Sequence, residues 1–125
     1  ASALCRIIES DGVAIGYAHA VEIGVWGHEW PHEVPAGTWD IDLIIASEAH
    51  RERGLAGIAL TQLSAEVFTT TMALACSGVV SIRNEAAVRA YERAGFRWLR
   101  IWNDPLLGPS WLMLKKRPAP PQPAR

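Results

Sequence analysis

The pattern of hydrophobic and polar positions predicts six strands in this chain of 125 residues. Each strand is a short apolar or alternating run bounded by turn-forming residues. The first two flank Asp11-Gly12, a dipeptide typical of a tight hairpin. The third alternates and then becomes continuously apolar, as a strand in the middle of a sheet does. The predicted strands cover residues 4–10, 13–23, 38–47, 72–80, 96–102 and 110–116.

Two helices are predicted between these strands. From Leu55 to Val67, apolar residues recur at intervals of three and four. Residues 85–94 follow Asn84, a good N-cap, and precede Gly95, which suits the end of a helix. The order strand–strand–strand–helix–strand–helix–strand–strand predicts an α/β (α+β) fold around a central mixed sheet. The third strand, first helix and fourth strand should form a right-handed βαβ unit.

The chain length predicts one domain, over residues 1–117, followed by a proline-rich tail at 118–125 that we expect to be disordered. No apolar run is long enough to span a membrane, and no secretory signal is visible. The two cysteines, Cys5 and Cys76, are expected to be unpaired, buried thiols in a cytoplasmic protein. His28 and His32 are four residues apart but flank Pro31, so we predict no metal site.

The net charge of −1 hides an asymmetry between the two halves of the chain. Residues 1–50 contain one basic and eight acidic side chains, a net charge of −7. Residues 51–125 contain eleven basic and five acidic side chains, a net charge of +6. The halves therefore either bind a cation and an anion respectively, or intermingle in the fold without such a role. The basic residues are too scattered to predict a nucleic-acid surface.

The stretch that opens the first helix combines basic residues with glycine. Arg51 and Arg53 come directly before Gly54, and Gly57 follows within the first turn. Glycine lets a ligand approach the backbone, and a helix N-terminus offers free N–H groups and a positive dipole end. This indicates an anion site. The phosphate-loop and dinucleotide-binding signatures are both absent.

Two motifs make the family recognisable. Residues 51–56, RERGLA, fit the R/Q-x-x-G-x-G/A signature of the GNAT N-acetyltransferases, and residues 84–96, NEAAVRAYERAGF, resemble their N-x-x-A-x-x-x-Y-E-K-x-G-F segment. The two motifs stand in the family's order and separation. Within the family, residues 7–116 most resemble the aminoglycoside 6′-N-acetyltransferases. The resemblance implies the GNAT fold and an acetyl-CoA-dependent transfer to a primary amine of a small cationic substrate, such as an aminoglycoside.

The resemblance also implies where acetyl-CoA would bind. The pyrophosphate would lie on the turn that opens the first helix, and the pantetheine arm along the third strand, where that strand splays from its neighbour. A backbone N–H there could polarise the thioester carbonyl. Asn84 would be both an N-cap and a cofactor contact. The implied cofactor-binding residues are Ile44, Ile45, Ala46, Arg51, Glu52, Arg53, Gly54, Leu55, Ala56, Gly57 and Asn84.

Two residues carry the implied acid–base chemistry. Asp42 matches the aspartate proposed as general base in the aminoglycoside enzymes, although it could instead be a structural carboxylate capped by backbone. Tyr91 matches the family's tyrosine, whose phenol could protonate the departing sulfur, or it could be a core aromatic. Asp40 shares a strand face with Asp42, so the pair could bind a cation, or Asp40 could simply be solvated.

The loop at residues 24–37, together with the start of the third strand, combines aromatic and acidic side chains without Lys or Arg. That mixture suits an aminosugar, which is a polycation with apolar ring faces. The alternative is a tryptophan-rich packing loop with solvated acids. With Asp40, the predicted acceptor-binding residues are Trp26, Glu29, Trp30, Glu33 and Trp39.

The sequence departs from the family at its start, because a GNAT domain normally begins with a further strand and two helices. An N-terminally short domain would leave one side of the acceptor site uncovered, so we expect a homodimer, with loop 24–37 or the last strands at the interface. Two other functions stay open. One is acetylation of a protein or peptide, and the other is a non-catalytic CoA-binding module.

Overall fold

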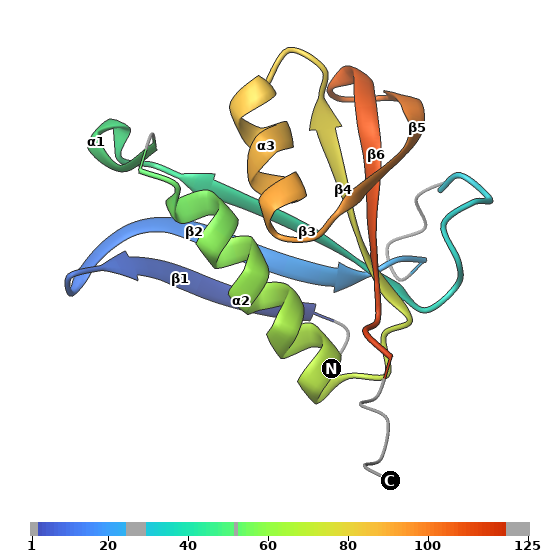
Figure 1. The fold of residues 1–125 in the computed structure, drawn as a ribbon, viewed down its shortest axis with the longest axis horizontal. Helices are drawn as coiled ribbons and strands as arrows, with labels where there is room; N and C mark the ends of the chain where they lie inside the picture. Colours follow the sequence, from blue (N-terminus) through green and yellow to red (C-terminus); the bar gives the residue numbers. More distant parts are fainter. Residues whose placement is uncertain (1–2, 25–29, 52, 120–125) are drawn as a thin grey trace, which may run out of the picture.

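The computed structural model describes residues 3–24, 30–51 and 53–119. Six strands and two longer helices form within these residues, as the pattern predicts, and a one-turn helix precedes the first long one (Figure 1). The elements in chain order are β1 (Ala3–Ser10), β2 (Val13–Glu22), β3 (Thr38–Ile45), α1 (Glu48–Arg51), α2 (Leu55–Thr70), β4 (Ala75–Ser81), α3 (Glu85–Arg93), β5 (Arg97–Asp104) and β6 (Gly108–Lys116).

The short helix α1 and the start of β4 differ most from the sequence-based expectation. The single turn α1 was not predicted; it forms because the main-chain N–H of His50 donates to Ser47 O at 3.0 Å while the His50 ring contacts the Ser47 hydroxyl. The fourth strand begins at Ala75 and not at residue 72, since Met72 is almost fully exposed and Thr71 caps the end of α2.

The six strands form one mixed sheet in the order β1-β2-β3-β4-β6-β5. All neighbours are antiparallel except β3 and β4, which run parallel as the predicted βαβ unit requires. That parallel pairing covers only the three rungs from Thr38–Ala75 to Asp40–Ser77. Beyond the Asp40–Ser77 rung the two strands diverge (Figure 1). We call this gap the β3–β4 opening.

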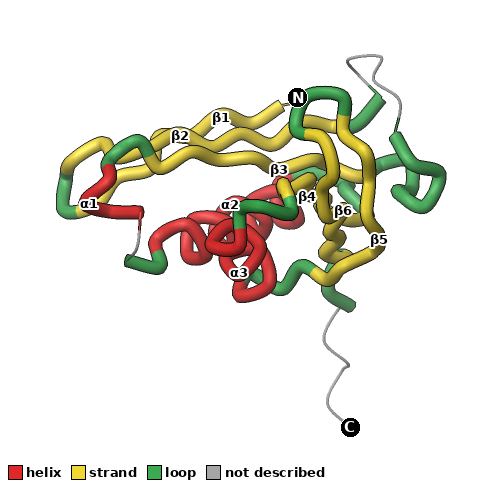
Figure 2. The backbone as a smooth tube through the Cα atoms, turned by 90° about the horizontal axis from the view of Figure 1, so that it is seen from above, coloured by secondary structure: helices red, strands yellow, loops and turns green. Residues whose placement is uncertain are grey.

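The core lies on one face of the sheet, under α2 and α3. Figure 2 shows both helices on the same side of β1, β2 and β3. Alternation along β3 sends Trp39 and Ile41 toward α2, where each is at most 2% exposed, and sends Asp40 and Asp42 to the opposite face. None of the helices in the described residues is both long and apolar enough to cross a membrane. Both cysteines are free thiols; Cys76 is buried but Cys5 is exposed.

Candidate active site

The start of α2 has the features of an anion-binding helix terminus. Its N-cap, Gly54, has a φ of 73° and makes no side-chain capping bond, and no acidic residue stands in the first turn. A Cβ at Gly54 would meet nothing within 4 Å, so the backbone there is approachable. The N–H groups of the first turn are consequently available to an anion, as the sequence predicts.

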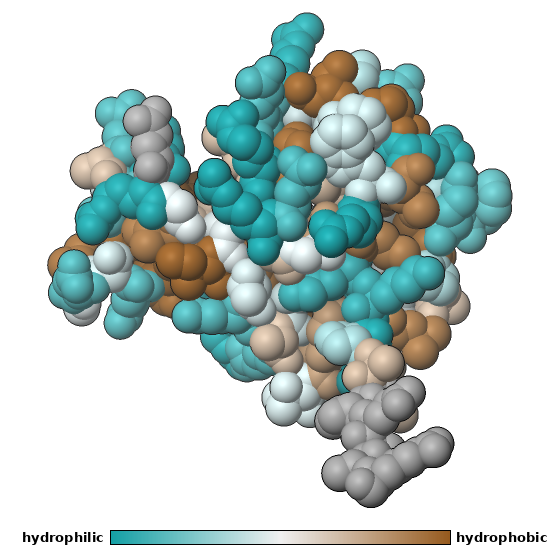
Figure 3. All heavy atoms as spheres, in the orientation of Figure 1, coloured by the Kyte–Doolittle hydropathy of each residue, from teal (hydrophilic) through white to brown (hydrophobic). Residues whose placement is uncertain are grey.

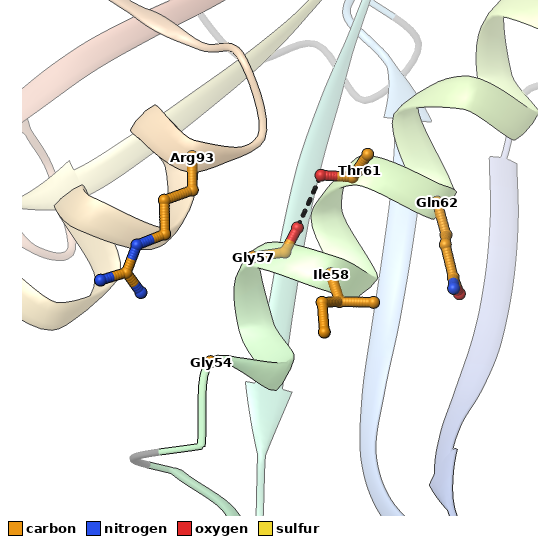
Figure 4. Close-up of a pocket in the computed structure, with 6 residues that line it drawn as sticks. All are labelled: Gly54, Gly57, Ile58, Thr61, Gln62 and Arg93. Atoms are coloured by element: carbon orange, nitrogen blue, oxygen red, sulfur yellow. Dashed lines mark hydrogen bonds between the residues drawn. The ribbon is translucent and has the colours of Figure 1, made fainter.

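A groove of about 340 Å³ runs along this helix start and is closed on one side by α3. Arg93 reaches from the last turn of α3 toward the first turn of α2 (Figure 4). Within the described residues Arg93 forms no ion pair, so its charge is available to a ligand in the groove. The lining residues are Gly54, Gly57, Ile58, Thr61, Gln62 and Arg93.

The surface around the groove is mixed in character. On the face shown in Figure 3, an apolar patch lies between the β1–β2 hairpin and the first turns of α2, and hydrophilic side chains gather over α3. Ile58, in the groove itself, is 53% exposed. A ligand that combines phosphate groups with apolar segments fits this combination better than a simple inorganic anion does.

The β3–β4 opening exposes one main-chain edge of β3. The N–H of Ile23 donates to Thr38 O at 3.0 Å, and that of Ala46 donates to Ile15 O at 2.8 Å. Antiparallel pairing alternates, so the even-numbered residues 38–46 direct their main-chain groups to β2. The residues whose main-chain groups point into the opening are Ile41, Leu43 and Ile45. Of the predicted pantetheine contacts, Ile45 thus has its main chain on this edge, whereas Ile44 and Ala46 are paired with β2.

Side chains contact several of these edge groups. The Tyr91 hydroxyl donates to Ile41 O at 2.7 Å, and Arg51 Nε donates to Ile45 O at 2.9 Å. The N–H of Leu43 donates to Asp42 Oδ1 at 2.9 Å. Arg51 therefore holds the end of β3 through hydrogen bonds from its guanidinium to the main-chain carbonyls of Ile45 and Ala46. Arg53 is exposed.

Tyr91 fills the apex of the opening. Its side chain is 5% exposed, and its ring packs edge-on against Phe96 at a centroid distance of 5.1 Å. The ring also lies against Gly78, where an added Cβ would stand 2.3 Å from the nearest ring atom. Burial raises the pKa of the Tyr91 phenol well above 10.0, and the charges of Asp40 and Asp42 add to that effect. The phenol is therefore neutral at the apex and keeps its proton.

Two carboxylates lie beside the apex on the face away from the helices. Asp42 is exposed, and Asp40 is half-buried and accepts a hydrogen bond at Oδ1 from the Ser77 hydroxyl at 2.9 Å. Burial raises the pKa of Asp40 from 3.8 to about 7; the Ser77 hydrogen bond opposes this rise, and the charges of Asp42 and Asp104 reinforce it. The opening thus has a helix start with free N–H groups near one side and carboxylates on the other.

Comparison with known families gives the decisive observation. The family described as acetyltransferase (GNAT) domain matches residues 2–103. This chain belongs to the GNAT acetyltransferase family. The short parallel pairing of β3 with β4 and the mixed sheet agree with that assignment, as the two sequence motifs predict.

Several solved structures resemble this GNAT domain. AAC(6')-Ib in complex with parmomycin and acetyl-CoA is 27% identical, with a TM-score of 0.80 over 93% of this chain and 66% of that chain. The aminoglycoside acetyltransferase AAC(6')-Ib with coenzyme A and kanamycin has the same identity and TM-score and is covered over 67% of its length.

A spermidine N-acetyltransferase chimera from Vibrio cholerae shares the fold at 18% identity, with a TM-score of 0.73 over 93% of this chain and 68% of that one. A search of curated proteins gave no match.

The chain spans about two thirds of the length of the AAC(6')-Ib structures that it resembles.

The predicted acceptor-binding residues of this GNAT domain are only partly brought together. Glu33 Oε2 accepts a hydrogen bond from Arg100 Nη1 of β5 at 2.8 Å, and this bond holds the pKa of Glu33 below its ordinary value. Trp30 is half-buried in the same loop. Trp39 is 2% exposed in the core, on the face opposite Asp40, and so lies apart from the acceptor side. Trp26 and Glu29 lie outside the described residues, as does Glu52, one of the predicted cofactor contacts.

The remaining predicted cofactor contacts lie near the groove or at the second motif. Leu55 and Ala56 belong to the first turn of α2 but do not line the groove, and Ala56 packs against the core. Asn84 is the N-cap of α3, and its side chain accepts from Ala87 N at 3.1 Å. The predicted capping role of Asn84 is thereby confirmed. Its contact with a cofactor stays a prediction.

Sequence reasoning missed three residues that shape the site: Ser77, Gly78 and Arg93. A glycine inside a buried strand commonly marks a close approach, so Gly78 carried a usable signal. In the sequence, Arg93 is explained as a favourable charge in the last turn of α3. That explanation gives no sign that Arg93 also lines the groove at the start of α2. The hydrogen bond of Ser77 to Asp40 joins residues 37 positions apart, and the sequence pattern gives no sign of it.

Proposed function

We propose that this GNAT domain transfers an acetyl group from acetyl-CoA to a primary amine of a small cationic substrate of the aminoglycoside or polyamine class. The observation that carries the proposal is the β3–β4 opening, which has a free helix start with Arg93 near one side and two carboxylates on the other. Acetyl-CoA is the donor substrate in this proposal. The likeness to AAC(6')-Ib solved with acetyl-CoA or coenzyme A supports that choice.

The groove at α2 is proposed to bind the pyrophosphate of acetyl-CoA. Gly54 and Gly57 present backbone without side chains, and Arg93 supplies a charge-assisted contact. The Leu43 carbonyl and the Ile45 N–H on the edge of β3 would pair with the pantetheine amides, since Asp42 already accepts from the Leu43 N–H and Arg51 donates to the Ile45 carbonyl. Tyr91, which holds its proton at the apex, would protonate the departing sulfur. Asp42, marked by the family resemblance as the proton acceptor, stands exposed on the acceptor side.

We expect CoA and acetyl-CoA to raise the melting temperature of the chain. Ligand at one hundred times its dissociation constant stabilises a protein by about 2.7 kcal/mol. Gly54→Asn should greatly reduce this shift, because asparagine tolerates a positive φ while its side chain enters the phosphate position. Gly108→Asn is the matched control: Gly108 has a φ of 74° and equally open surroundings but lies at the start of β6, directly after the β5–β6 turn.

A second pair of variants tests the charge in the groove. Arg93→Met should weaken CoA binding about tenfold or more, the loss expected for a charge-assisted hydrogen bond. Arg89→Met, on the same helix but paired with Glu85, should leave binding unchanged.

Activity is then measured as thiol release from acetyl-CoA with kanamycin, spermidine or a lysine peptide. If millimolar CoA does not raise the melting temperature, the proposed function is wrong. If only the lysine peptide is acetylated, the acceptor is a protein or peptide and not a small cationic substrate.

We also propose that two copies of the chain associate through the outer strand β5. Trp98 of this strand is 53% exposed and stacks on Trp111 at 4.6 Å, and Leu106 in the following turn is 94% exposed. Apolar side chains on an edge strand favour burial against a second surface. We expect sedimentation at micromolar concentration to give a dimer, and Leu106→Lys to shift it toward monomer. A monomer at every concentration would contradict this association.

A further inference from the structure

The two carboxylates at the opening differ in their surroundings. Asp42 is exposed, stands opposite His19 of β2, and accepts from the N–H of Leu43. Water solvates such a carboxylate well, which suits it to holding a cation. Asp40 is half-buried in the last paired rung of β3 and β4, where Ser77 fixes one of its oxygens. Its second oxygen, Oδ2, accepts no hydrogen bond from any residue in the described ranges.

The position of Asp40 relative to Tyr91 follows from the register. Asp40 and Ser77 form one rung, and the next residue of each strand contacts Tyr91. Ile41 accepts the Tyr91 hydroxyl at 2.7 Å, and Gly78 lies against the Tyr91 ring. The Asp40 carboxylate and the phenol therefore belong to neighbouring rungs at the apex of the opening, where β3 and β4 separate.

We propose that Asp40 accepts the proton of the attacking amine, and that Asp42 binds an ammonium group of the same substrate. This assignment rests on the proposed acetyltransferase function. The proton acceptor is then Asp40 in place of Asp42, two residues closer to the apex along β3. The Ser77 hydroxyl orients this carboxylate, and its rung is next to the one that contacts Tyr91.

The protons balance in this scheme. The acceptor enters as R–NH3⁺ and gives one proton to Asp40 Oδ2, which leaves a neutral amine. The amine nitrogen bonds to the thioester carbonyl carbon, and the carbon–sulfur bond breaks. The nitrogen then loses its surplus proton as the sulfur gains one through Tyr91, which gives the amide and the CoA thiol. Asp40 finally releases its proton to solvent, so the net reaction yields one H⁺ for each amide formed.

The environment of Asp40 supports this role. A carboxylate is a better base the closer its pKa lies to the working pH, and burial raises that of Asp40 to about 7. The titratable groups around it are Asp42 on β3, Cys76 on β4, Tyr91 on α3 and Asp104 on β5, with His19 of β2 beside Asp42. Cys76 and Tyr91 keep their protons, because burial raises the pKa of the Cys76 thiol to about 12 and raises the pKa of the phenol well above its ordinary value. Asp40 is thus the group placed to titrate near neutrality at the apex.

The test compares Asp40→Asn with Asp42→Asn, using the best acceptor among kanamycin, spermidine and a lysine peptide. Asparagine at 40 keeps an oxygen for Ser77 but cannot take a proton. We expect kcat to fall about 10²–10⁴-fold and the acid limb of the pH–rate profile to vanish. Asp42→Asn should raise KM for the amine and keep the acid limb. If Asp42→Asn removes the acid limb and Asp40→Asn keeps it, the assignment is overturned.

Ser77→Ala provides a second measurement that needs no loss of activity. The Ser77 hydrogen bond lowers the pKa of Asp40, so its removal should move the acid limb to higher pH. A limb that stays in place would count against Asp40. The CoA-induced thermal shift distinguishes a failure of the role of Asp40 from a failure of the acetyltransferase function. A normal shift and normal acetylation in Asp40→Asn would refute only the role of Asp40, whereas an unmutated protein that shows neither would refute the acetyltransferase function itself.

Discussion

Gly78→Ala is expected to destabilise the protein by about 2–4 kcal/mol, a large effect for the addition of one methyl group. The added carbon would stand 2.3 Å from one ring atom of Tyr91 and 2.8 Å from the next. The ring cannot simply turn away, because it is 5% exposed, packed against Phe96, and tied through its hydroxyl to Ile41 O. Either β4 shifts or the tyrosine leaves the apex and abandons that hydrogen bond.

The matched control is another glycine-to-alanine change in the same chain. At Gly57 an added Cβ would be 3.5 Å from its nearest neighbour, Ala90 O, which is an ordinary contact. Gly57→Ala should therefore be neutral or stabilising, since alanine favours helix by up to about 1 kcal/mol over glycine. Urea unfolding of both variants measures the difference.

A double variant identifies the clash itself. Tyr91→Ala removes the ring that the new methyl group would strike, so Gly78→Ala in that background should lose most of its cost. Additive losses in the double variant would show that Gly78 is needed for some other reason. Because Tyr91 is also the proposed proton donor, Gly78→Ala should reduce kcat more than it reduces CoA binding.

The fold was largely predictable, because local rules and the fold agree along most of the chain. Asn84 caps α3, Gly54 opens α2 with a positive φ, and the apolar end of the third strand lies at the centre of the sheet. The start of β4 was misplaced because alanine, leucine and methionine at 72–75 carry little strand preference. The boundary is set there by the hydrogen bonds that end α2. The spacing of hydrophobic residues does not predict those bonds.

The geometry of the candidate site was predictable where it depends on the local backbone alone, as at residues 54–57, which open α2. It was less predictable where two distant side chains meet. Trp39 looked like an acceptor contact because it stands beside acidic residues, but the alternation of β3 sends it into the core. Glu33 looked free because the basic residue that pairs with it, Arg100, is 67 positions away. The sequence suggested that Asp40 binds a cation together with Asp42 or is solvated at the start of the strand, and only the pairing of β3 with β4 places Ser77 beside it.

The same carboxylate should make the stability of the protein depend on pH. The pKa of Asp40 is about 7 in the folded protein and 3.8 as the ordinary value. Between these values the folded state binds more protons than the unfolded state, so the free energy of unfolding falls as the pH rises from about 4 to about 7. One pKa unit corresponds to about 1.4 kcal/mol, so holding Asp40 ionised above pH 7 costs the fold up to about 4 kcal/mol.

Asp40→Asn should remove this cost. Against the unmutated protein, the variant should be more stable above about pH 7, and the advantage should shrink steadily toward about pH 4. Other groups titrate in both proteins and cancel in the difference, including Glu33, whose lowered pKa acts in the opposite direction. Urea unfolding at several pH values measures that difference directly. Ser77→Ala should steepen the pH dependence, since it removes the hydrogen bond that favours the ionised form.

If the free energy of unfolding of Asp40→Asn differs from that of the unmutated protein by the same amount at every pH, Asp40 ionises as an exposed carboxylate does. Its claim to accept a proton near neutrality would then lose its physical basis. If the variant instead gains stability above pH 7 and loses the acid limb of its rate profile, one cause explains both. The burial that makes ionised Asp40 costly for the fold is the burial that makes it a useful base, and asparagine removes the two effects together.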